Sequence, residues 1–314
     1  MLRRIPSGHP SRSKLEDELA KSYAGYRGEQ SIDYYLSSLT KKTDLIFHDI
    51  RLPSKDKTYF QIDIFVLTTN FCIILEVKNI AGTLYFDPFF HQLIRTLNDK
   101  EEGFPDPILQ MNRQKAHLVT WLQKNNLPNI PIYSFVVISH PSSVIKTTSS
   151  SHFLQKTSQD VIHASAIPTK LHSLIEKHQQ EYITIKEQRK IARLLLKQHE
   201  PANPHLFKPF AIVPSDIQTG VYCAECFHLP IKKIKGGWLC PVCAAKFPNA
   251  HLLSFVDYFL LISPAITNKQ FRDFFHVSSV STATKMLKGL SFDYSGTFKD
   301  RVYHIDFAAL RKLC

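Results

Sequence analysis

Two acidic residues and a lysine lie near the ends of two neighbouring apolar runs of this sequence. Asp63 lies in the run 61–67, and Glu76 and Lys78 end the run 72–78. A two-residue turn at Thr69 and Asn70, with Asn70 tolerating a positive φ, would pair position 67 with 72 and position 63 with 76. Strict alternation would place Asp63, Glu76 and Lys78 on one face of the hairpin, with apolar residues including Ile62 and Ile64 on the other.

Two carboxylates that face each other across strands repel, since their Cβ atoms lie only about 4.5–5.5 Å apart. In a sheet covered on both faces, this repulsion favours a bound cation or a raised pKa on one carboxyl. Mg²⁺ fits, because it takes one or two carboxylates together with water and phosphate oxygens. Lys78 would then orient or deprotonate a water molecule, or hold a phosphate oxygen. The alternative is that both carboxylates mark solvated strand ends and that Lys78 is their salt-bridge partner.

These residues resemble the PD-(D/E)XK nuclease superfamily and, within it, the nuclease-related domain (NERD) branch. The resemblance covers roughly residues 20 to 140 and rests on four blocks, namely 25–29 (Gly-Tyr-Arg-Gly-Glu), 61–63 (Gln-Ile-Asp), 76–79 (Glu-Val-Lys-Asn) and 106–110 (Asp-Pro-Ile-Leu-Gln). Three positions depart from the pattern: Ile62 replaces a proline, Asp106 an asparagine and Phe71 a glycine.

The resemblance implies a fold and a site. The fold would be α/β, with a restriction-endonuclease-like mixed sheet flanked by helices. Asp63 and Glu76 would hold Mg²⁺ or Mn²⁺, Lys78 would be the catalytic lysine, and Glu29 and Gln110 would complete the site.

Four cysteines form a second set of residues that can do chemistry. Cys223, Cys226, Cys240 and Cys243 make two Cys-x-x-Cys pairs separated by 13 residues, a spacing typical of a zinc ribbon. Four thiolates close a tetrahedral site, so the zinc would be structural; the alternative is a redox dithiol pair. We expect the other two cysteines, Cys72 and Cys314, to be bystanders.

The sequence after the ribbon predicts a helix over 251–262, a second from a capping box at Thr267 to residue 275, a third over 278–290 and a β-ribbon over 294–305. This order resembles a winged helix-turn-helix. The third helix would present Lys285 and Lys288 to DNA, and the ribbon would add Lys299 and Arg301. The alternative is a small helical module with solvated lysines.

Composition favours a polyanionic partner and predicts no membrane span. The 314 residues carry a net charge of +12, and the excess is spread evenly over the parts before and after residue 200. No apolar run is long enough for a transmembrane helix, and no secretory signal is present at the N-terminus, so we expect a cytoplasmic, reducing environment.

Hydrophobic periodicity predicts the elements that would position these residues. A helix over 15–39 contains Gly25 and Gly28. Because glycine destabilises a helix relative to alanine, two glycines one turn apart indicate that the helix backbone packs closely against the sheet. Asp106 and Pro107 begin a helix that runs to residue 124, and a buried strand over 132–139 follows, parallel to an earlier strand. Further expected elements are strands at 46–50, 83–90 and 160–163 and helices at 169–178 and 185–199.

Five segments follow from these features. They are a disordered N-terminus (1–14), the nuclease-like domain (15–200), a linker (201–218), the zinc ribbon (219–248) and a winged-helix-like module (249–314). The leading hypothesis is a metal-dependent nuclease acting on nucleic acid, with DNA favoured, and carrying C-terminal nucleic-acid-binding modules. The alternatives are a non-catalytic DNA-binding or regulatory protein on an inactive nuclease-like scaffold, and an adaptor whose ribbon binds another protein.

Overall fold

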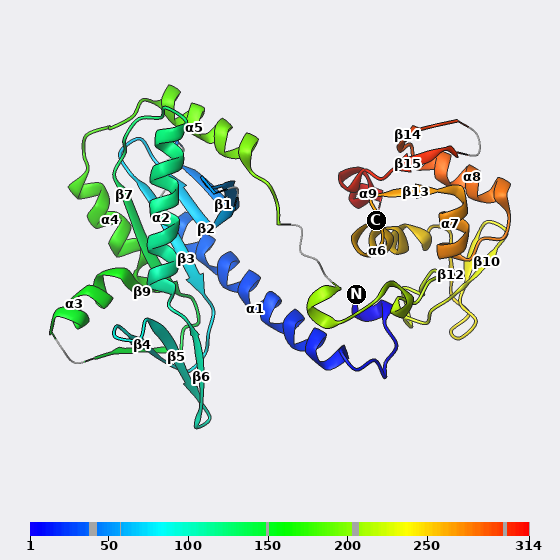
Figure 1. Ribbon diagram of the computed structural model, residues 1–314, viewed down its shortest axis with the longest axis horizontal. Coiled ribbons are helices and arrows are strands. Elements are labelled where there is room, and N and C mark those ends of the chain that lie inside the picture. Colours follow the sequence, from blue (N-terminus) through cyan, green and yellow to red (C-terminus); the bar gives the residue numbers. More distant parts are fainter. Residues whose placement is uncertain (38–42, 57, 149–150, 203–206, 298–299, 314) are drawn as a thin grey trace. The chain divides into compact units, whose positions relative to one another are not determined.

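The computed structural model describes residues 1–37, 43–56, 58–148, 151–202, 207–297 and 300–313 (Figure 1). The chain divides into two compact units, one formed by residues 19–203 and the other by residues 1–18 together with 204–314. Each unit has its own hydrophobic core, and they are described in turn.

A five-stranded mixed sheet forms the centre of the unit at 19–203, as the sequence predicts. Its order is β1 (Leu45–Pro53), β2 (Tyr59–Leu67), β3 (Cys72–Lys78), β7 (Ile132–Ile138) and β9 (Val161–His163). The predicted hairpin register is confirmed, because Leu67 pairs with Cys72. The predicted parallel strand is confirmed as well, since β7 runs parallel to β3.

The hairpin turn does not need the positive φ that we expected at Asn70, which is not among the described residues with positive φ. Instead, the Thr68 hydroxyl accepts hydrogen bonds from the backbone N–H groups of Asn70 and Phe71, at 3.1 and 2.9 Å. These bonds hold the turn in an ordinary backbone conformation.

Helices cover both faces of the central sheet (Figure 1). On one face, α2 (Pro107–Lys124) and α5 (Ile185–Gln198) contribute Leu118, Trp121 and Ile191 to a core cluster with β2 and β3. On the other face lie α1 (Arg12–Ser37) and α4 (Ile167–Lys177), with Ile32 and Leu171 buried. Asp106 caps α2 as predicted, accepting from the backbone N–H groups of the first turn.

A second sheet and a short helix were not foreseen. The sheet has the order β6 (Lys100–Pro105), β5 (Gln92–Leu97), β4 (Thr83–Asp87) and β8 (Val144–Thr147), and the helix is α3 (Ser151–Asp160). The expected strand over 83–90 ends at Asp87, whose carboxylate accepts from the N–H groups of Phe89 and Phe90. The resulting turn leaves both rings exposed, at 65% and 79%, so they lie outside the core although aromatic side chains are usually buried.

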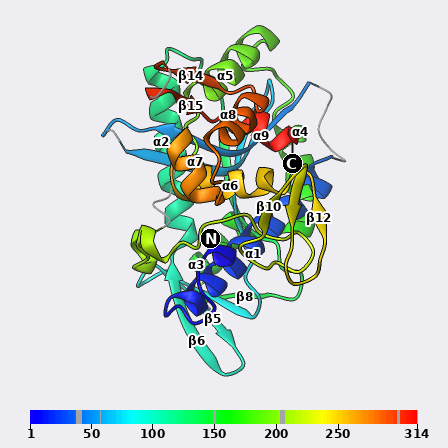
Figure 2. The ribbon, with the colours of Figure 1, turned by 90° about the vertical axis from the view of Figure 1, so that its right-hand side faces the viewer.

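The second unit contains the ribbon and the helical module (Figures 1 and 2). The ribbon strands are β10 (Lys232–Ile234), β11 (Gly237–Leu239) and β12 (Lys246–Phe247). The elements that follow are α6 (His251–Leu261), β13 (Ala265–Thr267), α7 (Asn268–Phe275), α8 (Val280–Gly289), β14 (Asp293–Ser295), β15 (Val302–His304) and α9 (Phe307–Leu313). The predicted capping box is present, because Thr267 and Gln270 exchange hydrogen bonds at the start of α7.

The first residues of the chain belong to this second unit and are not disordered as the composition suggested. Residues 2–4 form a 3₁₀ helix, and the Arg4 side chain is fully buried. Its guanidinium donates to Asp257 on α6 at 2.8 Å and to the carbonyl of Gly220 at 2.7 Å. A buried acceptor on a distant helix therefore orders a segment whose local composition favours disorder.

None of the described helices is both long enough and apolar enough to cross a membrane.

Candidate functional site

The alternation of side chains along β2 breaks at Asp63. Phe60 and Ile62 pack in the same core cluster as Phe65, whereas Ile64 lies in the cluster on the other face of the sheet. Our expectation that Ile62 shares a face with Ile64 is therefore wrong. The irregularity extends to β1, where Asp49, opposite Asp63, has a φ of 52°.

Asp63 turns its carboxylate toward strand β3. Regular β2–β3 pairing runs from Leu67 and Cys72 to Ile64 and Leu75, which makes Asp63 and Glu76 the next pair in register. At that point the Oδ2 atom of Asp63 accepts the backbone N–H of Val77 at 2.9 Å. The carboxylate thus replaces a ladder hydrogen bond and is held at the end of the hairpin.

Glu76 is buried, with 1% of its surface exposed, and both of its carboxylate oxygens are engaged. Oε1 accepts from Lys78 Nζ at 2.6 Å, and Oε2 accepts from Gln114 Nε2 at 2.5 Å. Lys78 Nζ also donates to Gln110 Oε1 at 3.3 Å. Strand β3 and helix α2 thereby bring together three predicted site residues, Glu76, Lys78 and Gln110, and a fourth, Gln114, that lies outside the predicted set.

Negative charge accumulates at this corner of the sheet. Burial, followed by the nearby charge of Glu76, raises the pKa of Asp63 to about 7 against the opposing effects of the Val77 N–H and Lys78; Glu29 adds to the rise. The pKa of Glu29 is itself raised, first by burial and then by Asp49 and Glu76. The predicted residue Glu29 therefore shares the field of Asp63 and Glu76. Asp49 joins the same field and was missed, although its position opposite Asp63 in the β1–β2 register could have indicated it.

Gly28 brings α1 close to the site. A Cβ at Gly28 would lie 2.6 Å from Asn79 Cβ and 2.8 Å from Ser139 Oγ, so only glycine permits this approach. Asn79, directly after Lys78 in the chain, donates to the carbonyl of Ala24 on α1 at 2.7 Å. The close packing predicted for the two glycines is confirmed for Gly28 alone, because nothing lies within 4 Å of a Cβ built at Gly25.

The donor set at this corner fits a hard divalent cation. Asp63 and Glu76 offer carboxylate oxygens, and two further buried oxygens, Gln114 Oε1 and Ser139 Oγ, have no hydrogen-bond partner. In the part of the chain that the structure describes, only the cysteine quartet forms a group of three or more ligand residues with all donor atoms within 4.8 Å. Among the described residues Asp63 and Glu76 are thus not part of such a group, and a divalent cation held by these two carboxylates would need water or substrate to complete its shell.

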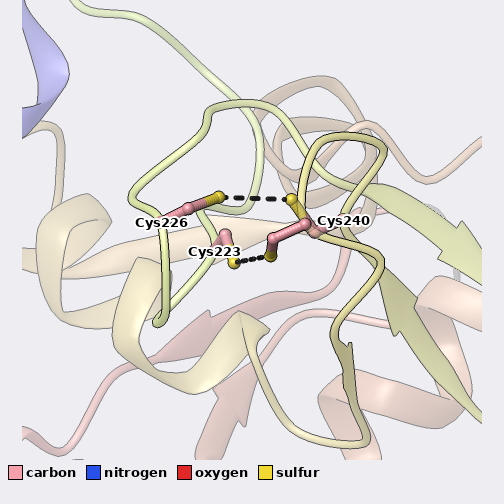
Figure 3. A group of neighbouring side chains, drawn as sticks. Cys223, Cys226 and Cys240 are labelled. Carbon is pink, nitrogen blue, oxygen red and sulfur yellow. Dashed lines mark hydrogen bonds between the residues drawn. The ribbon is translucent and has the colours of Figure 1, made fainter.

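The four cysteines of the ribbon converge as the spacing predicts (Figure 3). Their sulfur atoms all lie within 4.8 Å of one another, and the Cys223–Cys243 and Cys226–Cys240 pairs are each separated by 3.5 Å. Zn–S bonds of about 2.3 Å put the sulfurs of a tetrahedral site about 3.8 Å apart, so the four thiols fit one Zn²⁺.

Each cysteine pair is shaped by a turn that aims backbone N–H groups at sulfur. Phe227 and Ala244, each directly after the second cysteine of its pair, have φ near 58°. Burial would raise the pKa of Cys240, but the N–H groups of Cys243 and Val242 donate to its sulfur and lower the pKa to about 6. Such donors stabilise the thiolate, which is the form that binds zinc.

The lysines predicted to contact DNA are exposed on α8, where Lys285 and Lys288 lie one turn apart. Arg301 is partly buried, with its guanidinium 4.2 Å from the centre of the Tyr294 ring, so it packs on the β-ribbon. Lys299 lies outside the described residues.

Comparison with known proteins gives one family and one relative. The family model described as "Nuclease-related domain" matches residues 24–139. An uncharacterized protein of Bacillus anthracis is 25% identical over 137 residues, which cover 44% of this chain and 62% of the relative. The match thus spans about three-fifths of that relative's length, and no solved structure matches the chain.

Proposed function

We propose that the protein is a metal-dependent nuclease that hydrolyses phosphodiester bonds at the corner formed by Asp63, Glu76 and Lys78, because residues 24–139 match the nuclease-related domain model and contain this corner. One observation carries the proposal. A buried glutamate and a second carboxylate whose pKa rises to about 7 lie together with a lysine at the end of a hairpin. A purely structural site would gain little from this concentration of like charge.

A divalent cation, Mg²⁺ or Mn²⁺, held by Asp63 and Glu76 would supply Lewis-acid polarisation of the scissile phosphate. The rest of the chemistry falls to the protein. The Val77 N–H fixes the orientation of Asp63, and Gln114 fixes that of Glu76. Residues so held need little reorganisation when charge develops at the phosphate.

Lys78 has the most direct role in the proposed reaction. Its ammonium contacts Glu76 and Gln110, so it lies where a phosphate oxygen or an attacking water would approach the carboxylates. It can donate a hydrogen bond to a phosphate oxygen or exchange a proton with water. Gln110 positions the lysine, and Glu29 adds a carboxylate from α1 that can orient water.

The substrate we propose is nucleic acid, with DNA favoured. The supporting features are the net charge of +12 and the exposed lysines of α8, Lys285 and Lys288. The zinc ribbon and the helical module would bind the polymer, while the nuclease-related domain cuts it.

The test is cleavage of linear and circular DNA and of RNA by the purified full-length chain, with and without Mg²⁺. We expect Mg²⁺-dependent cleavage that Asp63→Asn and Lys78→Met each reduce by at least a hundredfold, in the range expected for loss of one electrostatic stabiliser. Asp63→Asn keeps an oxygen that can accept the Val77 N–H, so folding is preserved. Its matched control is Asp99→Asn, at an exposed turn position with a φ of 58° that asparagine tolerates.

Equal cleavage by Asp63→Asn and the wild type would reject the proposed site. Salt-sensitive DNA binding without cleavage under any metal condition would instead favour the alternative, a non-catalytic protein that uses the nuclease-like unit as a scaffold.

A further inference from the structure

A broad groove of about 1110 Å³ runs between the zinc ribbon and helix α8. One wall is the first hairpin of the ribbon, β10 and the turn after it, and the other is the start and outer face of α8. Both walls belong to the unit formed by residues 1–18 and 204–314. The groove therefore lies between the zinc ribbon and the helical module that follows it in the chain.

The charge of the groove has one sign. Lys232 and Lys235 project from the ribbon hairpin, and Lys285 projects from α8; all three are exposed. None of the described residues that line the groove is acidic. Three exposed ammonium groups on facing walls, without a carboxylate between them, favour an anionic occupant.

A fourth lysine of the lining has a structural role. Lys233 Nζ donates to the carbonyls of Ile234 and Gly237 at 2.9 and 3.0 Å and lies 5.4 Å from the centre of the Trp238 ring. Burial lowers the pKa of this lysine. Lys233 therefore shapes the hairpin, while its neighbours Lys232 and Lys235 stay available to a ligand.

Polar groups among the lining residues add hydrogen-bonding capacity to the groove. Ser279 and Thr282, at the start of α8, both line it, next to the positive end of the helix dipole. His251 also lines the groove; only 8% of its surface is exposed, and its buried Nδ1 has no hydrogen-bond partner. A buried polar atom without a partner is uncommon in a folded protein and indicates a missing water or ligand.

We infer that this groove binds the phosphodiester backbone of a nucleic-acid strand. Its size exceeds that of most small-molecule pockets, which are about 300–1,000 Å³, and its lysines are spread over two walls, as repeated phosphates require. No phenylalanine, tyrosine or tryptophan ring is among the described lining residues, so the groove has no platform for stacking bases. Binding should therefore depend on phosphate charge and little on base sequence.

This inference relies on the proposed function for the choice of nucleic acid as the polyanion, and its test is separate. The full-length chain carrying Asp63→Asn, without added Mg²⁺, is titrated into labelled duplex DNA, single-stranded DNA and single-stranded RNA, and binding is followed by fluorescence anisotropy at several salt concentrations. Groove variant Lys232→Ala/Lys285→Ala is compared with Lys246→Ala/Lys269→Ala, which removes the same charge at exposed positions outside the groove. Zinc content confirms that both variants keep the ribbon.

The groove pair should weaken binding several-fold and lower the slope of log K against log[salt] by about 1 for each lysine removed, whereas the control pair should change neither. The three nucleic acids identify which backbone form the groove prefers. Equal weakening by the two pairs, no weakening by the groove pair, or competition by polyglutamate as strong as that by DNA would overturn the inference.

The proposed nuclease activity can fail or hold independently of this result. With Asp63 restored, the groove pair should need a higher DNA concentration than the wild type to reach half its maximal cleavage rate, since it weakens binding of the polymer and leaves the corner at Asp63 intact. If DNA binding depends on the groove lysines but the wild type does not cleave, the proposed nuclease activity is rejected and the binding groove is supported. If the wild type cleaves but binding does not change in the groove pair, the nuclease activity is supported and the binding groove is rejected.

Discussion

Gln114 donates its side-chain amide to Glu76 at 2.5 Å, from helix α2 to strand β3, and both residues are at least 95% buried. The other oxygen of Glu76 accepts from Lys78. A buried carboxylate with only a lysine partner would be free to rotate toward the lysine, so the glutamine fixes the plane of the carboxylate. Gln114 therefore positions a candidate metal ligand without contacting the substrate itself.

Replacing Gln114 with leucine removes this hydrogen bond and leaves one oxygen of a buried carboxylate without a donor. The free energy of unfolding should fall by about 1–3 kcal/mol. Cleavage should require more Mg²⁺, because Glu76 is no longer held in place. Chemical denaturation and a Mg²⁺ titration of activity measure the two effects. The matched control is Gln123→Leu, at an exposed site on the same helix, and an equal effect of both variants would contradict the positioning role.

The raised pKa of Asp63 predicts a pH-dependent stability in the absence of Mg²⁺. The pKa is near 3.8 for an unperturbed carboxyl and about 7 in the folded protein, so the folded state holds the proton more tightly. This contribution to stability is fully present below pH 4 and is lost as the pH rises through 7. We therefore expect the melting temperature of the unit at 19–203 to fall between pH 5 and pH 8 relative to a variant that cannot ionise.

That variant is Asp63→Asn, and the quantity to measure is the difference between its melting temperature and that of the wild type at each pH. The histidines titrate in both proteins, so their contribution to the melting temperature cancels in this difference. It should grow as the pH rises, because the asparagine variant escapes the repulsion from Glu76 and Glu29. A difference that stays constant with pH would show that Asp63 does not titrate in this range.

Gly28 should be far less tolerant of substitution than Gly25. Alanine at Gly28 would place a methyl group 2.6 Å from Asn79 Cβ and 2.8 Å from Ser139 Oγ, so α1 would have to shift away from the site. We expect Gly28→Ala to reduce both cleavage and stability. Gly25→Ala meets no atom within 4 Å and should stabilise the helix by up to about 1 kcal/mol. Thermal unfolding of the two single variants gives the comparison, and equal behaviour would contradict the close approach.

The site was predictable where chemistry and hairpin register coincide. Two apolar runs joined by a short turn predicted that Asp63 lies opposite Glu76. The ladder has the register that this requires, since its last regular pair is Ile64 with Leu75. The break in alternation at Asp63 was not predictable, because the run of β2 reads as regular alternation; in the structure it lies opposite Asp49, whose φ is 52°. The role of Gln114 was also hidden, since a glutamine on a helix is usually exposed and only packing of α2 on β3 buries it.

In the fold, too, elements with a local apolar signal were predictable, whereas elements that depend on distant contacts were not. Strands with a continuous apolar run, such as β3 and β7, were predicted with their direction. Strand β6 contains Lys100, Glu101 and Glu102 and has little apolar signal, since its residues are mostly exposed. It forms by pairing with β5, an interaction outside its own sequence. The ordering of Arg4 likewise depends on a partner more than 250 residues away.

Removing zinc should loosen the core of the second unit. Trp238 is fully buried in the same cluster as Cys223 and Cys240, so loss of the metal should expose the indole. In a Trp121→Phe background, where Trp238 is the remaining tryptophan, a strong chelator should shift the emission to the red, and added Zn²⁺ should restore it. Elemental analysis should find about one zinc per chain, as one closed four-thiolate site requires. A metal-free protein whose emission depends on thiol oxidation would support a redox dithiol pair instead.

The ion pair between Arg4 and Asp257 should be the strongest polar contact of the second unit. Arg4 is fully buried and Asp257 is 3% exposed, and the pair is supported by carbonyls of Gln218 and Gly220. Asp257→Ala would leave a buried guanidinium without its counter-ion and should cost about 3–5 kcal/mol. Arg3→Ala removes a 44% exposed partner of the same carboxylate and should cost about 1 kcal/mol or less. Urea unfolding, followed by the fluorescence of Trp238 in the Trp121→Phe background, measures both variants. Similar losses for the two would mean that the N-terminal segment is held by its apolar contacts and that the buried charge contributes little.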